Sequence, residues 1–139
     1  MANILVVDDE DTVRNNLFEL FAIQHTCHMA ATAEQALTYL SVEQYDVVVT
    51  DYQMPGLSGL DLLAHVKDTQ KNTPVILISG LSNKERAEEL IEMGAFDYVV
   101  KPFSLSEIEV SVNRALSHRE ELLQKEKELS GTNRKRNER

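Results

Sequence analysis

Short runs of hydrophobic residues alternate along this chain with longer segments in which hydrophobic residues recur every three or four positions. The first run covers residues 4–7 and is followed by Val13, Leu17, Leu20 and Phe21. A run of this length fits a buried strand, whereas the later spacing places hydrophobic side chains on one face of a helix. The pattern therefore predicts that the chain begins with a strand and then a helix.

The same alternation continues to about residue 118. Further predicted strands cover residues 27–30, 46–50, 74–78 and 97–100, and further predicted helices cover residues 33–40, 59–66, 84–93 and a segment from about 106. The third and fourth strands are almost entirely hydrophobic, as in parallel strands that helices cover on both faces. Five strand–helix units predict an α/β fold with a doubly wound, five-stranded parallel sheet of the flavodoxin type. The common strand order of such a sheet is 2-1-3-4-5, with its switch point between the first and third strands.

The last predicted helix could continue past the sheet. Hydrophobic residues are spaced by seven along it, at Ile108, Ala115, Leu122 and Leu129. We expect the helix to end near Gly131, so the chain divides into a domain of residues 1–118 and a helical extension with a charged tail, residues 119–139. The extension could pair with a second copy to form a homodimer, lead into an output domain, or merely lengthen the helix. Arg119 and Glu126, at the other seam positions, weaken the case for a coiled coil.

Composition and charge narrow the classes of protein that this chain can represent. The 139 residues, 42% of them hydrophobic, suffice for one core. No apolar stretch is long enough to span a membrane and no basic leader precedes the first strand, so we expect a cytosolic (cytoplasmic) protein without a membrane partner. Of the net charge of −9, residues 1–118 carry −11 (7 basic, 18 acidic) and residues 119–139 carry +2 (7 basic, 5 acidic). An acidic body repels phosphate backbones, which argues against direct binding of nucleic acid.

Reactive or charged side chains follow four of the predicted strands. Asp8 and Asp9 follow the first strand, Asp51 the third, Ser79 the fourth and Lys101 the fifth. Because the carboxyl ends of parallel strands lie at one edge of a sheet, we expect these side chains to converge there. The switch point brings Asp8, Asp9 and Asp51 closest together. Such an edge could bind a cation and handle phosphate.

Three neighbouring carboxylates make this edge a candidate metal site. Like charges a few ångströms apart raise one another's pKa, and a divalent cation removes that conflict. Mg²⁺ prefers oxygen ligands and is usually held by one or two carboxylates and a phosphate, so we expect Asp9 and Asp51 to bind it directly and Asp8 through water. Cys27 is the only cysteine and the four histidines share no ligand spacing, so neither residue type predicts a metal site. Alternatively, Asp8 and Asp9 could simply stabilise the next helix N-terminus, and Asp51 could form a turn.

Lys101 and Ser79 could act on a phosphate at the same edge. The ammonium of Lys101 could pair with a carboxylate in the empty site and with a phosphoryl oxygen in the filled one. The bond from Lys101 to Pro102 could be cis, as prolyl bonds in tight turns sometimes are. Ser79 offers a hydroxyl, and Gly80 beside it leaves the approach unobstructed. Alternatively, Lys101 could be a plain surface lysine and Ser79–Gly80 a turn.

Taken together, these residues resemble the receiver domain of two-component response regulators. The resemblance covers about residues 3–118 and includes the segment Thr-Asp-Tyr-Gln-Met-Pro-Gly around Asp51. Its other motifs are the Asp8–Asp9 pair, Ser79 with Gly80, and Tyr98 followed by Lys101, Pro102 and Phe103. All occur in the family's order and spacing, with serine in place of the more frequent threonine at position 79.

The resemblance implies that Asp51 is the phosphoacceptor and attacks a phosphohistidine of a sensor histidine kinase or histidine phosphotransferase. It implies a Mg²⁺ ion held by Asp9, Asp51 and the backbone carbonyl of Gln53, with Asp8 orienting a metal-bound water. Lys101, with Ser79 and Gly80, would bind the phosphoryl group.

The resemblance also implies a switch and an output. Ser79 would move to the new phosphoryl group and Tyr98 would turn inward behind it, which remodels the surface of the fourth helix, fifth strand and fifth helix. Tyr98 could instead be an ordinary core aromatic. Such a protein is a phosphoacceptor switch rather than an enzyme, and its output domain could be missing from this chain.

Two other functions are weaker matches. Asp9, Asp11 and Val13 also resemble the first motif of haloacid-dehalogenase-like phosphatases, with Ser79 and Lys101 as later motifs. That family needs a further acidic pair after the lysine, and its pattern leaves Asp51 unexplained. An interaction module that has the fold but is not phosphorylated is the other alternative, and the complete set of site residues argues against it.

Overall fold

Five strands and five helices alternate along the residues that the computed structural model describes, 1–80 and 84–137. The elements are β1 (Asn3–Val7), α1 (Asp11–Ala22), β2 (Thr26–Ala30), α2 (Ala33–Val42), β3 (Val47–Asp51), α3 (Gly59–Thr69), β4 (Val75–Ser79), α4 (Lys84–Glu92), β5 (Asp97–Val100) and α5 (Leu105–Asn137). The predicted alternation is confirmed. Asp51 and Ser79 are themselves the last residues of β3 and β4, one position later than the predicted strand ends.

The strands form one parallel sheet in the order β2-β1-β3-β4-β5, which confirms the predicted doubly wound topology. Ile4 of β1 lies opposite Cys27 of β2 on one side and Val47 of β3 on the other. The connections that follow β1 and β3 lead to helices on opposite faces of the sheet, which leaves a crevice at the carboxyl ends of these two strands. This crevice is where Asp8, Asp9 and Asp51 lie.

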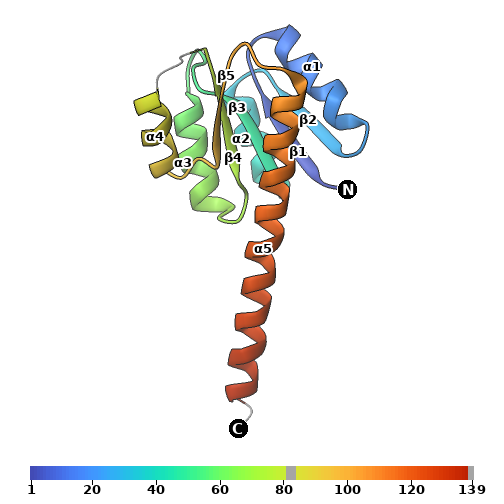
Figure 1. The fold of residues 1–139 in the computed structure, drawn as a ribbon, viewed down its shortest axis with the longest axis vertical. Coiled ribbons are helices and arrows are strands. Elements are labelled where there is room, and N and C mark those ends of the chain that lie inside the picture. Colours follow the sequence, from blue (N-terminus) through green and yellow to red (C-terminus); the bar gives the residue numbers. More distant parts are fainter. Residues whose placement is uncertain (81–83, 138–139) are drawn as a thin grey trace.

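Helices cover both faces of the sheet (Figure 1). Ile4 and Val6 point to the face covered by α1 and α5, where Leu17 and Ile108 are fully buried. Leu5 and its neighbour Val7 point to the opposite face, with the buried side chains of α2, α3 and α4. Because successive side chains of a strand alternate between faces, a strand buried on both must be apolar throughout, as β1, β3 and β4 largely are.

The first turns of α2 and α3 show why these helices begin where they do. The hydroxyl of Thr32 accepts a hydrogen bond from the backbone N–H of Gln35 at 3.1 Å. Ser58 and Asp61 form a reciprocal capping box at the start of α3. Each cap satisfies N–H groups that have no partner within the helix. The caps place the α2 N-terminus and the β3–α3 loop on the same side of the sheet as Asp51.

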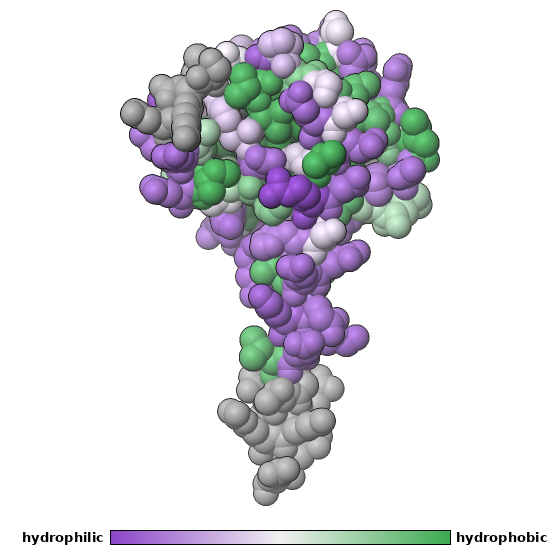
Figure 2. Space-filling view, viewed as in Figure 1, coloured by the Kyte–Doolittle hydropathy of each residue, from purple (hydrophilic) through white to green (hydrophobic). Residues whose placement is uncertain are grey.

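Helix α5 runs past the sheet and projects from the domain as a single rod (Figure 1). Ile108, Val112 and Ala115 are fully buried against the sheet, whereas Leu129 is 64% exposed. The part of the rod that is coloured in Figure 2 is predominantly hydrophilic on the face shown. The expectation that the helix ends near Gly131 was wrong, because it continues to Asn137. One glycine weakens a helix by only about 1 kcal/mol relative to alanine, which need not end it.

The first part of this extension is attached to its own domain. Arg119 donates from Nε to Asp46 Oδ1 at 2.8 Å and from Nη1 to the carbonyl of Asn72 at 3.2 Å. Two helical turns further along α5, Oε1 of Glu126 lies 3.0 Å from Lys71 Nζ. Its Oε2 accepts a hydrogen bond from Asn72 Nδ2 at 3.0 Å. These contacts occupy two of the seam positions that a coiled coil would need. Within the described ranges, no helix is both long and apolar enough to cross a membrane.

Candidate functional site

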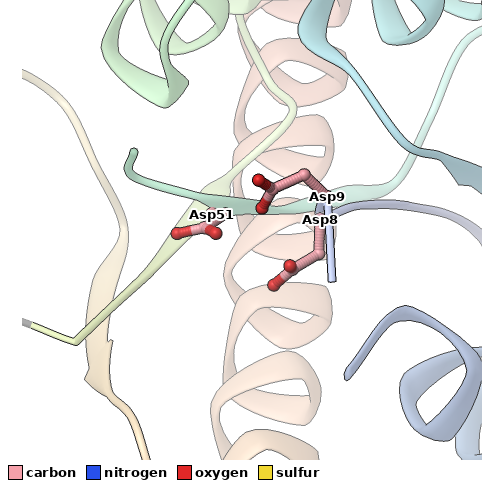
Figure 3. Close-up of side chains that lie close together, drawn as sticks. All are labelled: Asp8, Asp9 and Asp51. Atoms are coloured by element: carbon pink, nitrogen blue, oxygen red, sulfur yellow. The ribbon is translucent and has the colours of Figure 1, made fainter. Parts of the chain in front are cut away.

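The predicted carboxylates converge at the carboxyl edge of the sheet. Asp8 and Asp9 directly follow β1, and Asp51 ends the neighbouring β3. Figure 3 shows the three side chains gathered at this point. One oxygen of each lies within 4.8 Å of the others, which is close enough for a single ion to contact all three. The convergence therefore follows from the strand order.

The three carboxylates differ sharply in their exposure. Asp8 is fully buried and Asp51 is 6% exposed, whereas Asp9 is exposed. Burial raises the pKa of Asp8 above its ordinary value of 3.8. Burial, and then the charge of Asp8, raise the pKa of Asp51 to about 6. Ionising either of these buried acids therefore costs free energy in the folded protein.

Lys101 is the cation that offsets part of this cost. Its Nζ lies 3.1 Å from Asp8 Oδ2, 3.3 Å from Asp51 Oδ2 and 3.1 Å from Glu10 Oε1. Burial alone would lower the pKa of Lys101, but the hydrogen-bonded and charged carboxylates outweigh it and raise the pKa above the ordinary 10.5. The bond between Lys101 and Pro102 is cis.

The site has the chemistry of a magnesium site. Asp8 Oδ2 is buried, and its partner within the described part of the chain is the ammonium of Lys101, at 3.1 Å. The groups around it are carboxylate oxygens, and a single lysine faces four carboxylates when Glu10 is included. An excess of negative charge on oxygen ligands is what a hard divalent cation neutralises. The residues present therefore fit Mg²⁺.

The other predicted site residues lie at the same edge or next to it. The backbone N–H of Gln53 points to Asp51 Oδ1 at 3.4 Å. Ser79 is buried at the end of β4, and its carbonyl accepts from the N–H of Lys101 at 2.7 Å, which ties β4 to β5. Among the described residues, no atom lies within 4 Å of a Cβ atom added at Gly80. Tyr98 is the second residue of β5, three positions before Lys101.

Tyr98 is half-buried and packs against the core on the α4 side of the sheet. It borders a surface hollow of about 420 Å³ with Ala87 and Ile91 of α4. Its backbone N–H donates to Asp97 Oδ1 at 2.8 Å. This position, between core and surface, suits either an ordinary packing role or a ring that moves.

Two site residues escaped the sequence analysis. Glu10 contacts Lys101, 91 positions away, while its own N–H donates to Asp8 Oδ1 at 2.8 Å. Arg14 donates from Nη1 to the Asp8 carbonyl at 2.9 Å and pairs with Asp11. Acidic residues at a helix start suit the helix dipole, so no signal in the sequence separates Glu10 from that ordinary role. The i, i+3 spacing of Asp11 and Arg14 was the one available hint.

A groove adjoins the site on the side of α1. It has a volume of about 550 Å³ and is bordered by Lys101 and Gly80 from the site itself. Its other walls come from α1 and from the segment after β5, with apolar side chains that include Val13, Phe103 and Leu105. A partner seated here would touch both apolar surface and the rim of the carboxylate cluster.

Known proteins share this fold and this stretch of sequence. The family model described as "Response regulator receiver domain" matches residues 4–113. The regulatory protein AtoC of Escherichia coli is 42% identical over 114 residues, which are 81% of this chain and 25% of AtoC. The solved receiver domain of the Francisella response regulator 1452 superposes with a TM-score of 0.78 at 32% identity, over 84% of this chain and 98% of that one.

A longer solved protein also matches the chain. NtrX from Brucella abortus, solved in complex with ADP, gives a TM-score of 0.83 at 33% identity. The match covers 92% of this chain but 30% of NtrX. The chain thus spans a quarter of AtoC and less than a third of NtrX.

Proposed function

Because this chain belongs to the family of response regulator receiver domains, we propose that it is a phosphorylation switch whose acceptor is Asp51. The observation that carries the proposal is the Asp51 carboxylate itself, 6% exposed at the end of β3 and 3.3 Å from Lys101. In the proposed step, a carboxylate oxygen of Asp51 attacks the phosphorus of a phosphohistidine. The new P–O bond forms as the P–N bond breaks, and the leaving histidine recovers its electron pair.

The neighbouring acids hold the metal in this proposal. Asp9, Asp51 and the backbone carbonyl of Gln53 would bind Mg²⁺, and Asp8 would hold a metal-bound water. The ion, when bound, neutralises negative charge on the transferring phosphoryl group. The buried Oδ2 of Asp8, which the ammonium of Lys101 alone contacts among the described residues, and the excess of carboxylates over lysine support this role.

Lys101 changes partner during the proposed reaction. Before phosphorylation it pairs with Asp8, Glu10 and Asp51. Once Asp51 carries the phosphoryl group, its oxygens offer Lys101 a more strongly charged acceptor at the same edge. Glu10 is the partner most easily released, because its side chain is 60% exposed. Ser79 and Gly80 would complete the phosphoryl-binding site.

Switching would follow at the surface of α4, β5 and α5. Ser79 would shift toward the phosphoryl group, and Tyr98 would turn inward into the space that this movement opens. The half-buried position of Tyr98 beside α4 supports such a change. A charge change at one site would thereby bias the shape of a surface elsewhere.

The partner that donates the phosphoryl group is a sensor histidine kinase or a histidine phosphotransferase. The groove beside Lys101 supports this proposal, since its apolar walls adjoin the acceptor. A helix that carries the donor histidine would place its apolar face there and its phosphohistidine toward Asp51. The acidic body of the chain is unsuited to direct contact with nucleic acid.

We further propose that residues 1–118 are the receiver of a longer regulator and that residues 119–139 lead to its output domain. The projecting helix α5 and the match to part of NtrX support this view. No specific observation favours a haloacid-dehalogenase-like phosphatase. Asp11, one of that pattern's residues, pairs with Arg14 on α1 and does not belong to the carboxylate cluster.

Intact-mass spectrometry tests the acceptor directly. The chain is incubated with acetyl phosphate and MgCl₂, and Asp51→Asn and Asp68→Asn are treated in parallel. Asp68 is an exposed residue of α3, so its substitution controls for the loss of one carboxylate. We expect a single phosphoryl adduct on the native chain and on Asp68→Asn, absent without Mg²⁺ and absent in Asp51→Asn. An unmodified native chain, or an adduct on Asp51→Asn, would contradict the proposal.

A further inference from the structure

The loop that follows the acceptor is held at several points. This acceptor loop, residues 52–58, joins β3 to α3 and includes Gln53. Near its start, the N–H of Tyr52 donates to the Ile78 carbonyl at 2.7 Å, and Met54 is buried in the core. At its end, the N–H of Gly59 donates to the Tyr52 carbonyl at 3.0 Å. The capping box with Asp61 holds Ser58, so residues 55–57 are the part of the loop that these contacts do not fix.

A carboxylate from the neighbouring strand–helix unit contacts that stretch. Glu34, in the first turn of α2, accepts a hydrogen bond at Oε1 from the backbone N–H of Leu57 at 2.9 Å. The two residues are 23 positions apart. The backbone N–H is the one hydrogen-bond donor that Leu57 has, and this contact uses it. Glu34 therefore ties the loop to the start of α2.

Gly56 makes the close approach of this carboxylate feasible. A Cβ atom added at Gly56 would lie 2.7 Å from Glu34 Oε1, well inside ordinary contact distance. Gly56 also has a φ of +80°, a conformation that residues with a side chain rarely adopt. The loop backbone is thus shaped to receive the Glu34 carboxylate.

Glu34 is suited to this contact at neutral pH. The hydrogen bond from Leu57, followed by that from its own backbone N–H, lowers the pKa of Glu34 below the ordinary 4.5. The carboxylate also lies near the positive end of the α2 dipole. It stays ionised and remains a strong acceptor for an amide N–H.

From these contacts we propose that Glu34 is a positioning residue for the acceptor loop. Through its hydrogen bond with Leu57, Glu34 holds the backbone of residues 53–57. The loop then keeps the arrangement in which the Gln53 carbonyl can bind a divalent cation beside Asp51. This inference rests on the proposed function, and it assigns Glu34 no contact with the phosphoryl group or the metal. Outer groups that orient a ligand in this way commonly alter metal affinity without altering the fold.

Three variants separate positioning from charge and from folding. Glu34→Ala removes the acceptor, whereas Glu34→Gln keeps an oxygen acceptor and removes the charge. Glu19→Ala is the matched control, because Glu19 is exposed on α1 and has no hydrogen bond or ion pair within the part of the chain that the structure describes. For each variant, Mg²⁺ affinity is measured by calorimetric titration, and exchange of the Leu57 and Gln53 amides by NMR. The initial rate of adduct formation with acetyl phosphate is recorded separately.

We expect Glu34→Ala to exchange the Leu57 amide faster and to bind Mg²⁺ roughly 10-fold more weakly, the lower end of the effect for groups that orient metal ligands. Adduct formation at sub-saturating Mg²⁺ should slow by a similar factor and recover at saturating Mg²⁺. Glu34→Gln should lie near the native protein, and Glu19→Ala should match it.

Other results would overturn the inference. Native Mg²⁺ affinity in Glu34→Ala would show that the loop holds its shape without this contact. Equal weakening in Glu34→Gln and Glu34→Ala would show that long-range charge is responsible. If the native chain forms no adduct, the proposed function fails, while the Mg²⁺ titration and the amide exchange still decide the role of Glu34.

Discussion

Replacement of Asp51 by asparagine should stabilise the metal-free protein. Asp51 is 6% exposed, and burial together with the charge of Asp8 raises its pKa to about 6. Asparagine keeps the shape of the side chain and removes the charge. The variant therefore resembles the protonated form of Asp51, which the folded protein favours more than the unfolded chain does.

The size of the effect follows from linkage between proton binding and folding. Between pH 3.8 and about 6, the folded protein holds a proton on Asp51 that the unfolded chain releases, so stability falls as the pH rises through this window. Above this pH window, ionised Asp51 lowers the free energy of unfolding by its full amount. That amount is about 3 kcal/mol, at 1.36 kcal/mol per tenfold change in proton affinity. At about pH 4.5 the same relation gives a destabilisation of about 1 kcal/mol. The raised pKa already includes the attraction of Lys101, so no separate correction is needed for that ion pair.

Urea unfolding measures the difference in unfolding free energy between Asp51→Asn and the native chain. Far-ultraviolet circular dichroism is the signal, because the chain has no tryptophan for fluorescence. The native chain, Asp51→Asn and Asp68→Asn are compared in EDTA at about pH 8 and about pH 4.5, where Asp51 is mostly ionised and mostly protonated. With excess MgCl₂ at about pH 8, the difference in unfolding free energy between Asp51→Asn and the native chain should become smaller. The reason is that Mg²⁺ at ten times its dissociation constant stabilises the native chain by about 1.4 kcal/mol. Asp51→Asn, with one ligand fewer, should gain less from the ion.

The reasoning fails if Asp51→Asn is no more stable than the native chain in EDTA at about pH 8. It also fails if the stabilisation is as large at acid pH, since a penalty from ionisation must fade when Asp51 is protonated. Asp68→Asn should show neither the stabilisation nor its pH dependence. A change in the slope of unfolding free energy against urea concentration would indicate a different unfolded state. A second spectroscopic probe would then be needed.

Four further substitutions and one deletion have defined outcomes. Gly59→Ala should lower the unfolding free energy by about 2 kcal/mol or more, because the new Cβ would lie 2.2 Å from the carbonyl oxygen of Asp51. Gly80→Ala, whose Cβ meets nothing within 4 Å, should leave thermal unfolding nearly unchanged, and equal losses in the two variants would refute the steric argument. Lys101→Met should destabilise the metal-free protein by about 3 kcal/mol, because it leaves buried carboxylates without a cation. Excess Mg²⁺ should restore most of that loss in chemical unfolding, and a loss that Mg²⁺ leaves unchanged would speak against a cation site. Arg119→Ala should make the helical extension more sensitive to limited proteolysis while the domain stays folded. Since the extension contacts its own domain, light scattering should give the mass of one unphosphorylated chain with or without residues 119–139, and a dimer lost on deletion would show pairing through this helix.

Much of the fold could be predicted because its signals are local. Hydrophobic runs of strand length and periodic segments of helix length are visible without any long-range information, and parallel strands must end at a common edge. That rule predicts from the sequence that Asp8, Asp9, Asp51 and Lys101 lie together. The roles of these residues in phosphoryl transfer and of Tyr98 in switching stay predictions.

The contacts between exposed polar residues could not be predicted. Glu10 and Lys101 meet across 91 positions, Arg119 and Asp46 across 73, and Glu34 reaches Leu57 across 23. Surface polar residues carry no periodic signal, and each has an ordinary role in solvent that the sequence cannot distinguish from a specific one. The end of α5 was also missed, because one glycine shifts helix stability by only about 1 kcal/mol.

The sequence alone therefore determined the order of the elements and the edge at which the reactive side chains meet. The tertiary structure decided the environment of each side chain. Asp8 and Asp9 are adjacent and chemically identical, yet Asp8 is fully buried beside Lys101 and Asp9 is exposed. Successive side chains leave a strand end in different directions, and only the packing of the surrounding elements determines which one is removed from water. Burial, and not the residue type, raises the pKa of the Asp8 carboxyl group above its ordinary value.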